Sequence, residues 1–231
     1  YFNYRLTGEF TDGIGSQVGY IPFDFKNQSW CKPGDWKWHA MPLSLEKLPK
    51  LVASGEKIGE VTPAAASATG LLKSTIVFAG ASDKACEVLG AGCLAHNTAS
   101  ISCGTTATIN TTHEKYLETQ AFIPSYPAAI PGHYNCEVQV FRGYWMVSWF
   151  KKEFGQPEQK KAELSEFTEE SYLDELGRDI PPGSDGLVLQ PFWNPGLGEP
   201  GPEARGSIIG FNDSHTRAHL YRALLEGLAY A

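Results

Sequence analysis

The sequence predicts an α/β fold, because short apolar strands alternate with segments of helical periodicity along the chain. Residues 75–80 form a continuous apolar run that ends at glycine, a pattern typical of a strand buried on both faces. Helical spacing follows it, which predicts a strand–turn–helix unit over 75–92. Residues 100–110 alternate around a Gly-Thr pair and predict a β-hairpin.

Shorter elements are expected between and after these segments. Residues 45–52 predict a short helix with Ser44 as its cap and Pro49 as a defect, and residues 144–154 predict a helix ended by Gly155. Short strands are expected around residues 138–140, 187–189 and 207–209.

Two further helical segments are expected in the last third of the chain. Residues 215–231 repeat leucine on one stripe, with Asp213 or Ser214 as the cap. Residues 156–179 hold eight acidic and three basic residues with leucines at near-helical spacing. We interpret this acidic stretch as an amphipathic, solvated segment rather than as a recognition tail.

Composition restricts the class of protein. The 231 residues are 42% hydrophobic and 19% charged, which excludes a disordered chain, a collagen-like repeat and a coiled coil. Lysine and arginine number 19 against 26 acidic residues, for a net charge of −7. We therefore expect no broad surface for nucleic acid.

The sequence also indicates where the protein acts. No run approaches the roughly 18–20 apolar residues of a membrane span, so no membrane partner is expected. The five cysteines form no CxxC pair, which favours reduced thiols and a cytoplasmic location. The chain begins at Tyr1, and Met41 and Met146 are its only methionines, so we expect it to be a piece of a longer polypeptide.

Gly80–Lys84 is the strongest candidate for chemistry. It follows the predicted buried strand, and functional groups in α/β sheets gather beyond the carboxyl ends of strands. Asp83 falls in the first turn of the following helix, where the helix dipole favours an ionised carboxylate that can accept a proton. The alternative is an aspartate that only caps the helix, and local evidence does not separate the two.

Ser102–Thr106 is a second candidate. Its glycine allows a close approach to an anion, and its two threonine hydroxyls and turn N–H groups can donate to phosphate oxygens. An ordinary hairpin tip is the alternative.

Other patterns are interpreted as structural. The GxGxxG match over 196–201 is not a dinucleotide site, because Pro200 and Pro202 forbid the helix that should follow. His215 and His219 lie four residues apart, as in some metal sites, but no HExxH motif accompanies them, so no metal ligand is assigned.

Two weaker possibilities remain. The tryptophans of residues 30–38 could stack on a sugar, although packing is the more common role. Cys86 or Cys103 with His96 could form a nucleophile and base, on residue type alone.

Several segments occur in an order that is specific as a set. They are Arg5–Gly8, Phe78–Asp83, Ser102–Thr106, Pro191–Trp193, Ala204–Gly206 and Gly206–Glu226. Together they resemble the FGGY family of carbohydrate kinases, which includes glycerol kinase, xylulokinase and gluconokinase. The resemblance covers essentially the whole chain.

The resemblance implies an actin/hexokinase-like (ribonuclease H-like) fold of two lobes that flank a cleft. Residues 1–97 would be the end of the first, sugar-binding lobe, and residues 98–231 the start of the second, ATP-binding lobe. It also implies ATP and Mg²⁺ as cofactors and a sugar or polyol as the substrate. Self-association into a homodimer is left open.

The resemblance also implies residue roles. Asp83 would be the catalytic base that takes the proton from a sugar hydroxyl, and Gly104, Thr105 and Thr106 would hold the phosphates of ATP. Lys84 stands where many relatives have Asn or Gln in contact with the substrate. It either contacts the sugar differently or points away from it.

Three functional hypotheses follow. The leading one is a central piece of an ATP-dependent sugar or polyol kinase, inactive by itself, since the family's DxGT loop and glycine-rich adenosine motif are not among these 231 residues. The alternative is a non-catalytic carbohydrate-binding or regulatory protein on the same fold. A Cys/His hydrolase is a remote third.

Overall fold

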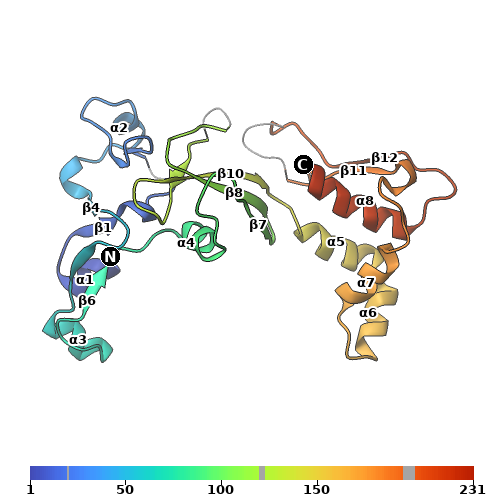
Figure 1. Cartoon of the computed structure of the whole chain (residues 1–231), viewed down its shortest axis with the longest axis horizontal. Coiled ribbons are helices and arrows are strands. Elements are labelled where there is room, and N and C mark those ends of the chain that lie inside the picture. Colours follow the sequence, from blue (N-terminus) through green and yellow to red (C-terminus); the bar gives the residue numbers. More distant parts are fainter. Residues whose placement is uncertain (20, 120–122, 195–200) are drawn as a thin grey trace. The chain divides into compact units, whose positions relative to one another are not determined.

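A computed structural model describes residues 1–19, 21–119, 123–194 and 201–231. The chain divides into two compact units (Figure 1). The first unit comprises residues 1–100 and 110–137, and the second comprises residues 101–109 and 138–231. Helices and strands are mixed in both units, as expected for an α/β protein.

The first unit is built from short elements. In chain order they are α1 (Phe2–Thr7), β1 (Thr11–Gly13), a 3₁₀ helix (Ile14–Ser16), β2 (Phe23–Asp24), β3 (Ser29–Trp30), α2 (Lys37–Ala40), a 3₁₀ helix (Leu45–Lys47), β4 (Lys50–Val52), β5 (Lys57–Glu60), α3 (Pro63–Thr69), β6 (Ile76–Phe78), α4 (Asp83–Gly90) and β9 (Tyr126–Pro127). β1 pairs with β4 in parallel, whereas β2 with β3 and β5 with β6 are antiparallel pairs.

The strand–turn–helix unit is present, but the expected burial of its strand is wrong. Among the described residues β6 pairs with β5 alone, and its side chains Ile76 and Phe78 are 47% and 58% exposed. An apolar run reveals which residues can be buried, but it does not reveal how many strands or helices cover them in this chain.

The helix expected over residues 45–52 is also wrong. A short 3₁₀ turn covers Leu45–Lys47, and β4 begins at Lys50. Pro49 has no N–H group and cannot continue the helical hydrogen bonds, and β4 instead pairs with β1.

The predicted hairpin is confirmed and forms one side of a four-stranded sheet. β7 (Ser100–Cys103) and β8 (Ala107–His113) are neighbours, and β8 is followed by β10 (Tyr134–Val140) and β9 in the order β7-β8-β10-β9.

In its described residues the second unit continues with four α-helices and two strands. The sequence predicted four of these elements singly, and it predicted the acidic stretch, which forms the other two, as one segment. The six elements are α5 (Trp145–Phe154), α6 (Gln156–Glu163), α7 (Glu169–Gly177), β11 (Val188–Gln190), β12 (Ser207–Ile209) and α8 (Arg217–Tyr230). The acidic stretch therefore forms two helices. Leu173 in α7 is fully buried, whereas Leu164, just after α6, is 88% exposed.

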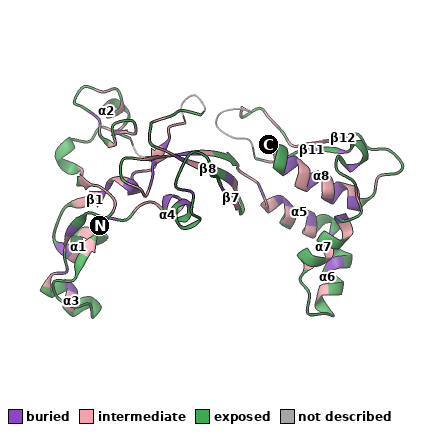
Figure 2. Ribbon diagram, in the orientation of Figure 1, coloured by how far each residue is buried: buried purple, intermediate pink, exposed green. Residues whose placement is uncertain are grey.

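α8 supplies much of the core of this unit. Its leucine stripe is buried, as predicted, against Phe150 and Leu173 from α5 and α7 (Figure 2). The predicted caps, Asp213 and Ser214, are wrong: the helix is capped by Thr216, whose backbone N–H donates to Nδ1 of His219 at 3.1 Å.

No helix in the described ranges is both long and apolar enough to cross a membrane.

Candidate active site

Asp83 is the first residue of α4, directly after the turn that ends β6. The capping bond at this helix start is made by Ser82, whose hydroxyl accepts from the backbone N–H of Ala85 at 3.2 Å. The cap does not need Asp83, so the alternative in which this aspartate only caps the helix loses its main support. The Asp83 carboxylate is exposed and accepts the backbone N–H of Lys84 at 2.7 Å.

This position suits a proton acceptor. The aligned peptide dipoles and free N–H groups of α4 favour negative charge at its first turn. An exposed carboxylate here can approach a substrate hydroxyl.

Lys84 lies beside Asp83, but its ammonium group is engaged along the helix. Nζ of Lys84 is 2.7 Å from Oε2 of Glu87, one turn further on, and a third of the side chain is exposed. This ion pair places the Lys84 charge along the surface of α4.

The phosphate-turn candidate connects β7 to β8 in the second unit. The hydroxyl of Thr106 donates to the Phe141 carbonyl at 3.1 Å, and the Gly104 carbonyl accepts the Tyr144 backbone N–H at 3.0 Å. The hydroxyl proton of Thr106 is therefore used within the protein. Thr105 is exposed, so its hydroxyl and the N–H groups of the turn are the donors that an anion could reach.

The chain that enters α5 packs tightly on this turn. A Cβ placed at Gly143 would overlap the backbone nitrogen of Ala107, so only glycine fits there. Gly143 was not among the functional residues predicted from the sequence. A glycine between a predicted strand and a predicted helix is a signal of close backbone approach and could have identified it.

The cysteines and His96 do not form a catalytic pair in the described structure. The Cys86 thiol lies 3.7 Å from the Ala81 carbonyl. Burial, together with the neighbouring Cys103 thiol, raises the pKa of Tyr144. His96 instead lies near His113, with 6.5 Å between ring centroids.

The two histidines at the start of α8 and just before it, His219 and His215, have structural partners. Nδ1 of His215 accepts the Asn212 N–H at 2.9 Å, and Nε2 of His219 is 3.2 Å from Oδ2 of Asp185. Among the described residues, no group of three or more His, Cys, Asp or Glu is arranged to hold a metal ion. The glycine pattern at 196–201 lies outside the described residues apart from Gly201.

The tryptophan cluster is partly a packing feature. Trp30 stacks edge-on with Phe23 at 5.6 Å and donates to the Pro49 carbonyl, whereas Trp36 is 65% exposed. The packing interpretation therefore fits Trp30.

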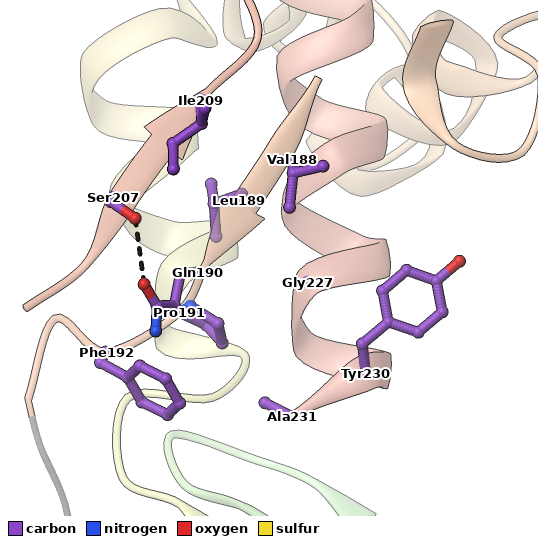
Figure 3. A pocket seen from close by; sticks show the side chains of 10 residues that line it. All are labelled: Val188, Leu189, Gln190, Pro191, Phe192, Ser207, Ile209, Gly227, Tyr230 and Ala231. Carbon is purple, nitrogen blue, oxygen red and sulfur yellow. Dashed lines mark hydrogen bonds between the residues drawn. The ribbon is translucent and has the colours of Figure 1, made fainter. Parts of the chain in front are cut away.

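A groove of about 300 Å³ lies along β11, β12 and the end of α8 (Figure 3). Its lining is mostly apolar, and the Ser207 hydroxyl bonds to the Gln190 side chain at 3.1 Å. It contains no charged side chain, so we assign it no catalytic role.

Asp83 belongs to the first unit and the Gly104–Thr106 turn to the second.

Family models identify the class of protein. The N-terminal domain of the FGGY family of carbohydrate kinases matches residues 1–90, and its C-terminal domain matches residues 99–231. The chain belongs to this family.

Relatives and solved structures agree with this FGGY assignment. The chain is 32% identical to an uncharacterized sugar kinase, YgcE, of Escherichia coli (strain K12), over 99% of this chain and 46% of that protein. It is 30% identical to a xylulose kinase of Bacillus subtilis (strain 168), over 100% of this chain and 44% of the other. The crystal structure of a xylulose kinase from Rhodospirillum rubrum superposes with a TM-score of 0.84 at 28% identity, over 99% of this chain and 44% of that one.

The fold expectation is confirmed, because these FGGY structures have the actin/hexokinase-like fold. The chain spans less than half the length of the relatives that it matches.

Proposed function

We propose that this chain is part of a kinase that transfers the γ-phosphate of ATP to a hydroxyl of a sugar or polyol, with Asp83 as the general base. The observation that carries the proposal is the exposed Asp83 carboxylate at the start of α4, where Ser82 makes the helix cap. Membership of a carbohydrate kinase family supports the reaction class.

In the proposed reaction, the substrate hydroxyl oxygen forms a bond to the γ-phosphorus, and the bond from that phosphorus to the β–γ bridging oxygen breaks. The hydroxyl proton passes to the Asp83 carboxylate, and ADP leaves with the bridging oxygen. The protein contributes mainly position and charge, because the transferred phosphoryl group needs little covalent help.

Gly104, Thr105 and Thr106 are proposed to hold the β- and γ-phosphates. Thr105 and the turn N–H groups would donate to the phosphate oxygens, while Thr106 would shape the turn through its bond to Phe141. Mg²⁺ would arrive with ATP and neutralise phosphate charge. No step is assigned to a protein metal ligand among the described residues.

The substrate class is taken from the relatives, which include xylulose kinases and a gluconokinase of Bacillus subtilis (strain 168). We propose a sugar or polyol as the substrate and Lys84 as a residue at its edge, since Lys84 follows the base directly. We place the lobe boundary at residues 97/98 and the protein in the cytoplasm.

The first test is Asp83→Asn in the longest natural polypeptide that carries this sequence. Amide replaces carboxylate with the same shape but cannot take a proton at neutral pH. We expect turnover to fall by about 10²–10⁴-fold while ATP still binds. Asp179→Asn, an exposed change after α7, is the matched control and should keep its turnover. Normal turnover of Asp83→Asn would refute the role of Asp83.

A second test separates the kinase from the non-catalytic alternative. The longest natural polypeptide is assayed for ADP release with ATP and a panel of pentoses, hexoses and polyols. Sugar binding without ADP release would favour a carbohydrate-binding or regulatory protein. The 231-residue polypeptide alone should release no ADP in the same assay, and measurable phosphoryl transfer by it would contradict that expectation.

A further inference from the structure

The turn that precedes Asp83 is hydrogen-bonded on two sides to other segments of the first unit. On one side, the Ser82 backbone N–H donates to the Gly15 carbonyl at 2.8 Å. On the other side, the Ser54 hydroxyl donates to the Gly80 carbonyl at 3.1 Å. The residues on both sides are distant in sequence from Asp83, so the position of its carboxylate depends on tertiary contacts as well as on α4.

The contact at Gly15 leaves no room for a side chain. A Cβ placed there would overlap the Ser54 hydroxyl and lie 2.9 Å from Cβ of Ala81. A Cβ at Gly13 would lie 3.0 Å from the Gly80 carbonyl oxygen. Gly15 has no positive φ, so its constraint is the close packing on the turn rather than a backbone conformation.

The end of β1 and the 3₁₀ helix that carry these glycines are themselves fixed by Asp12. Its carboxylate accepts the Gly13 N–H at 2.8 Å and side-chain N–H groups of Gln17 at 3.0 Å and Asn3 at 3.2 Å. Gln17 is only 4% exposed and also donates to the Gly13 carbonyl at 3.1 Å. A buried amide with two local acceptors holds this segment in one conformation.

We propose that the segment from Asp12 to Gln17, with Ser54, positions the Asp83 carboxylate for phosphoryl transfer. This inference rests on the proposed function. The segment's residues act through the Gly80–Ser82 turn and make no chemical step. A displacement of the base by about 1 Å can lower a rate by roughly 10²-fold without loss of the fold.

The test is Gly15→Ala, with Gly90→Ala as its control. Gly90 lies at the end of α4 with open space around its Cβ position, so the same methyl group can be added there without contact. Both variants and the wild type are made in the longest natural polypeptide. The kcat is measured per folded molecule, together with the KM for ATP and the thermal midpoint.

We expect Gly15→Ala to lower kcat by about 10- to 100-fold with the KM for ATP unchanged, and Gly90→Ala to match the wild type. Ser54→Ala removes one hydroxyl and creates no overlap, so it is the alternative test of the positioning role if Gly15→Ala does not fold. It should lower kcat by roughly 3- to 10-fold at an unchanged thermal midpoint.

Two different failures are distinguishable. If the wild type is active and Asp83→Asn is not, then normal kcat in Gly15→Ala or in Ser54→Ala overturns the positioning role alone. If the wild type phosphorylates no sugar or polyol, or if Asp83→Asn keeps full turnover, the proposed function fails and the positioning role fails with it.

Discussion

At the scale of single residues, the neighbouring side chains of Ser82 and Asp83 at the start of α4 have different roles. Ser82 makes the capping bond of α4, and Asp83 keeps an exposed carboxylate. A helix that relied on Asp83 for its cap would weaken whenever that residue became protonated during a reaction. Here the proposed proton transfer leaves the cap intact.

Glu158 is a carboxylate with the opposite surroundings. It is 3% exposed and accepts two hydrogen bonds from the Arg217 guanidinium, one of them at 2.7 Å. These bonds outweigh the effect of burial and hold the pKa of Glu158 below its ordinary value of 4.5. The pair joins the start of α6 to the first turn of α8.

This lowered pKa predicts how stability depends on pH. A carboxyl whose pKa is lower in the folded state stabilises the protein above its unfolded pKa, and that stabilisation is lost as the pH falls through the folded value. We expect Glu158→Gln to lower the free energy of unfolding by roughly 1–3 kcal/mol at pH 7, and by progressively less below pH 4.5.

Urea unfolding at several pH values checks this prediction. Glu163→Gln is the control, because Glu163 is exposed at the other end of α6, and it should follow the wild type. A difference between Glu158→Gln and the wild type that stays constant from pH 7 to pH 3 would contradict the expectation.

At the scale of elements, short sequence patterns predicted correctly those helices and strands that form through contacts between residues close in the chain. The hairpin at 100–110 and the helices at 144–154 and 215–231 are present because turn residues and leucine spacing act over a few positions. The segment 45–52 shows the limit. Its apolar spacing suits a helix, but pairing with β1 and the missing N–H of Pro49 decide otherwise.

The same limit applies to the candidate site. Asp83 and the Gly104–Thr106 turn could be found in the sequence because each is a short motif at the end of a strand. The contacts that hold the turn before Asp83 could not be found in the sequence. Gly15, Ser54 and Gly80 are far apart in the chain, and no periodicity links them. Close glycine contacts become visible only when the backbones that meet are known.

At the scale of the whole molecule, the chain contains two compact units with separate buried side chains. The first unit buries Phe23 and Val88, and the second buries Phe150, Leu173 and Leu224 completely or nearly so. Each unit has its own hydrophobic contribution to stability, so a core change in one unit should act mainly on that unit.

The Leu224→Ala substitution tests whether the two units are independent. Leu224 is 0% exposed in the core of α5, α7 and α8, so its removal leaves a cavity and should lower the stability of the second unit by about 2–5 kcal/mol. Hydrogen exchange should accelerate at α5 and α8 amides and remain unchanged at the β5–β6 pair. Leu164→Ala is the control, because Leu164 is 88% exposed and its removal opens no cavity. Equal acceleration in β5 and β6 would show instead that the two units unfold as one cooperative body.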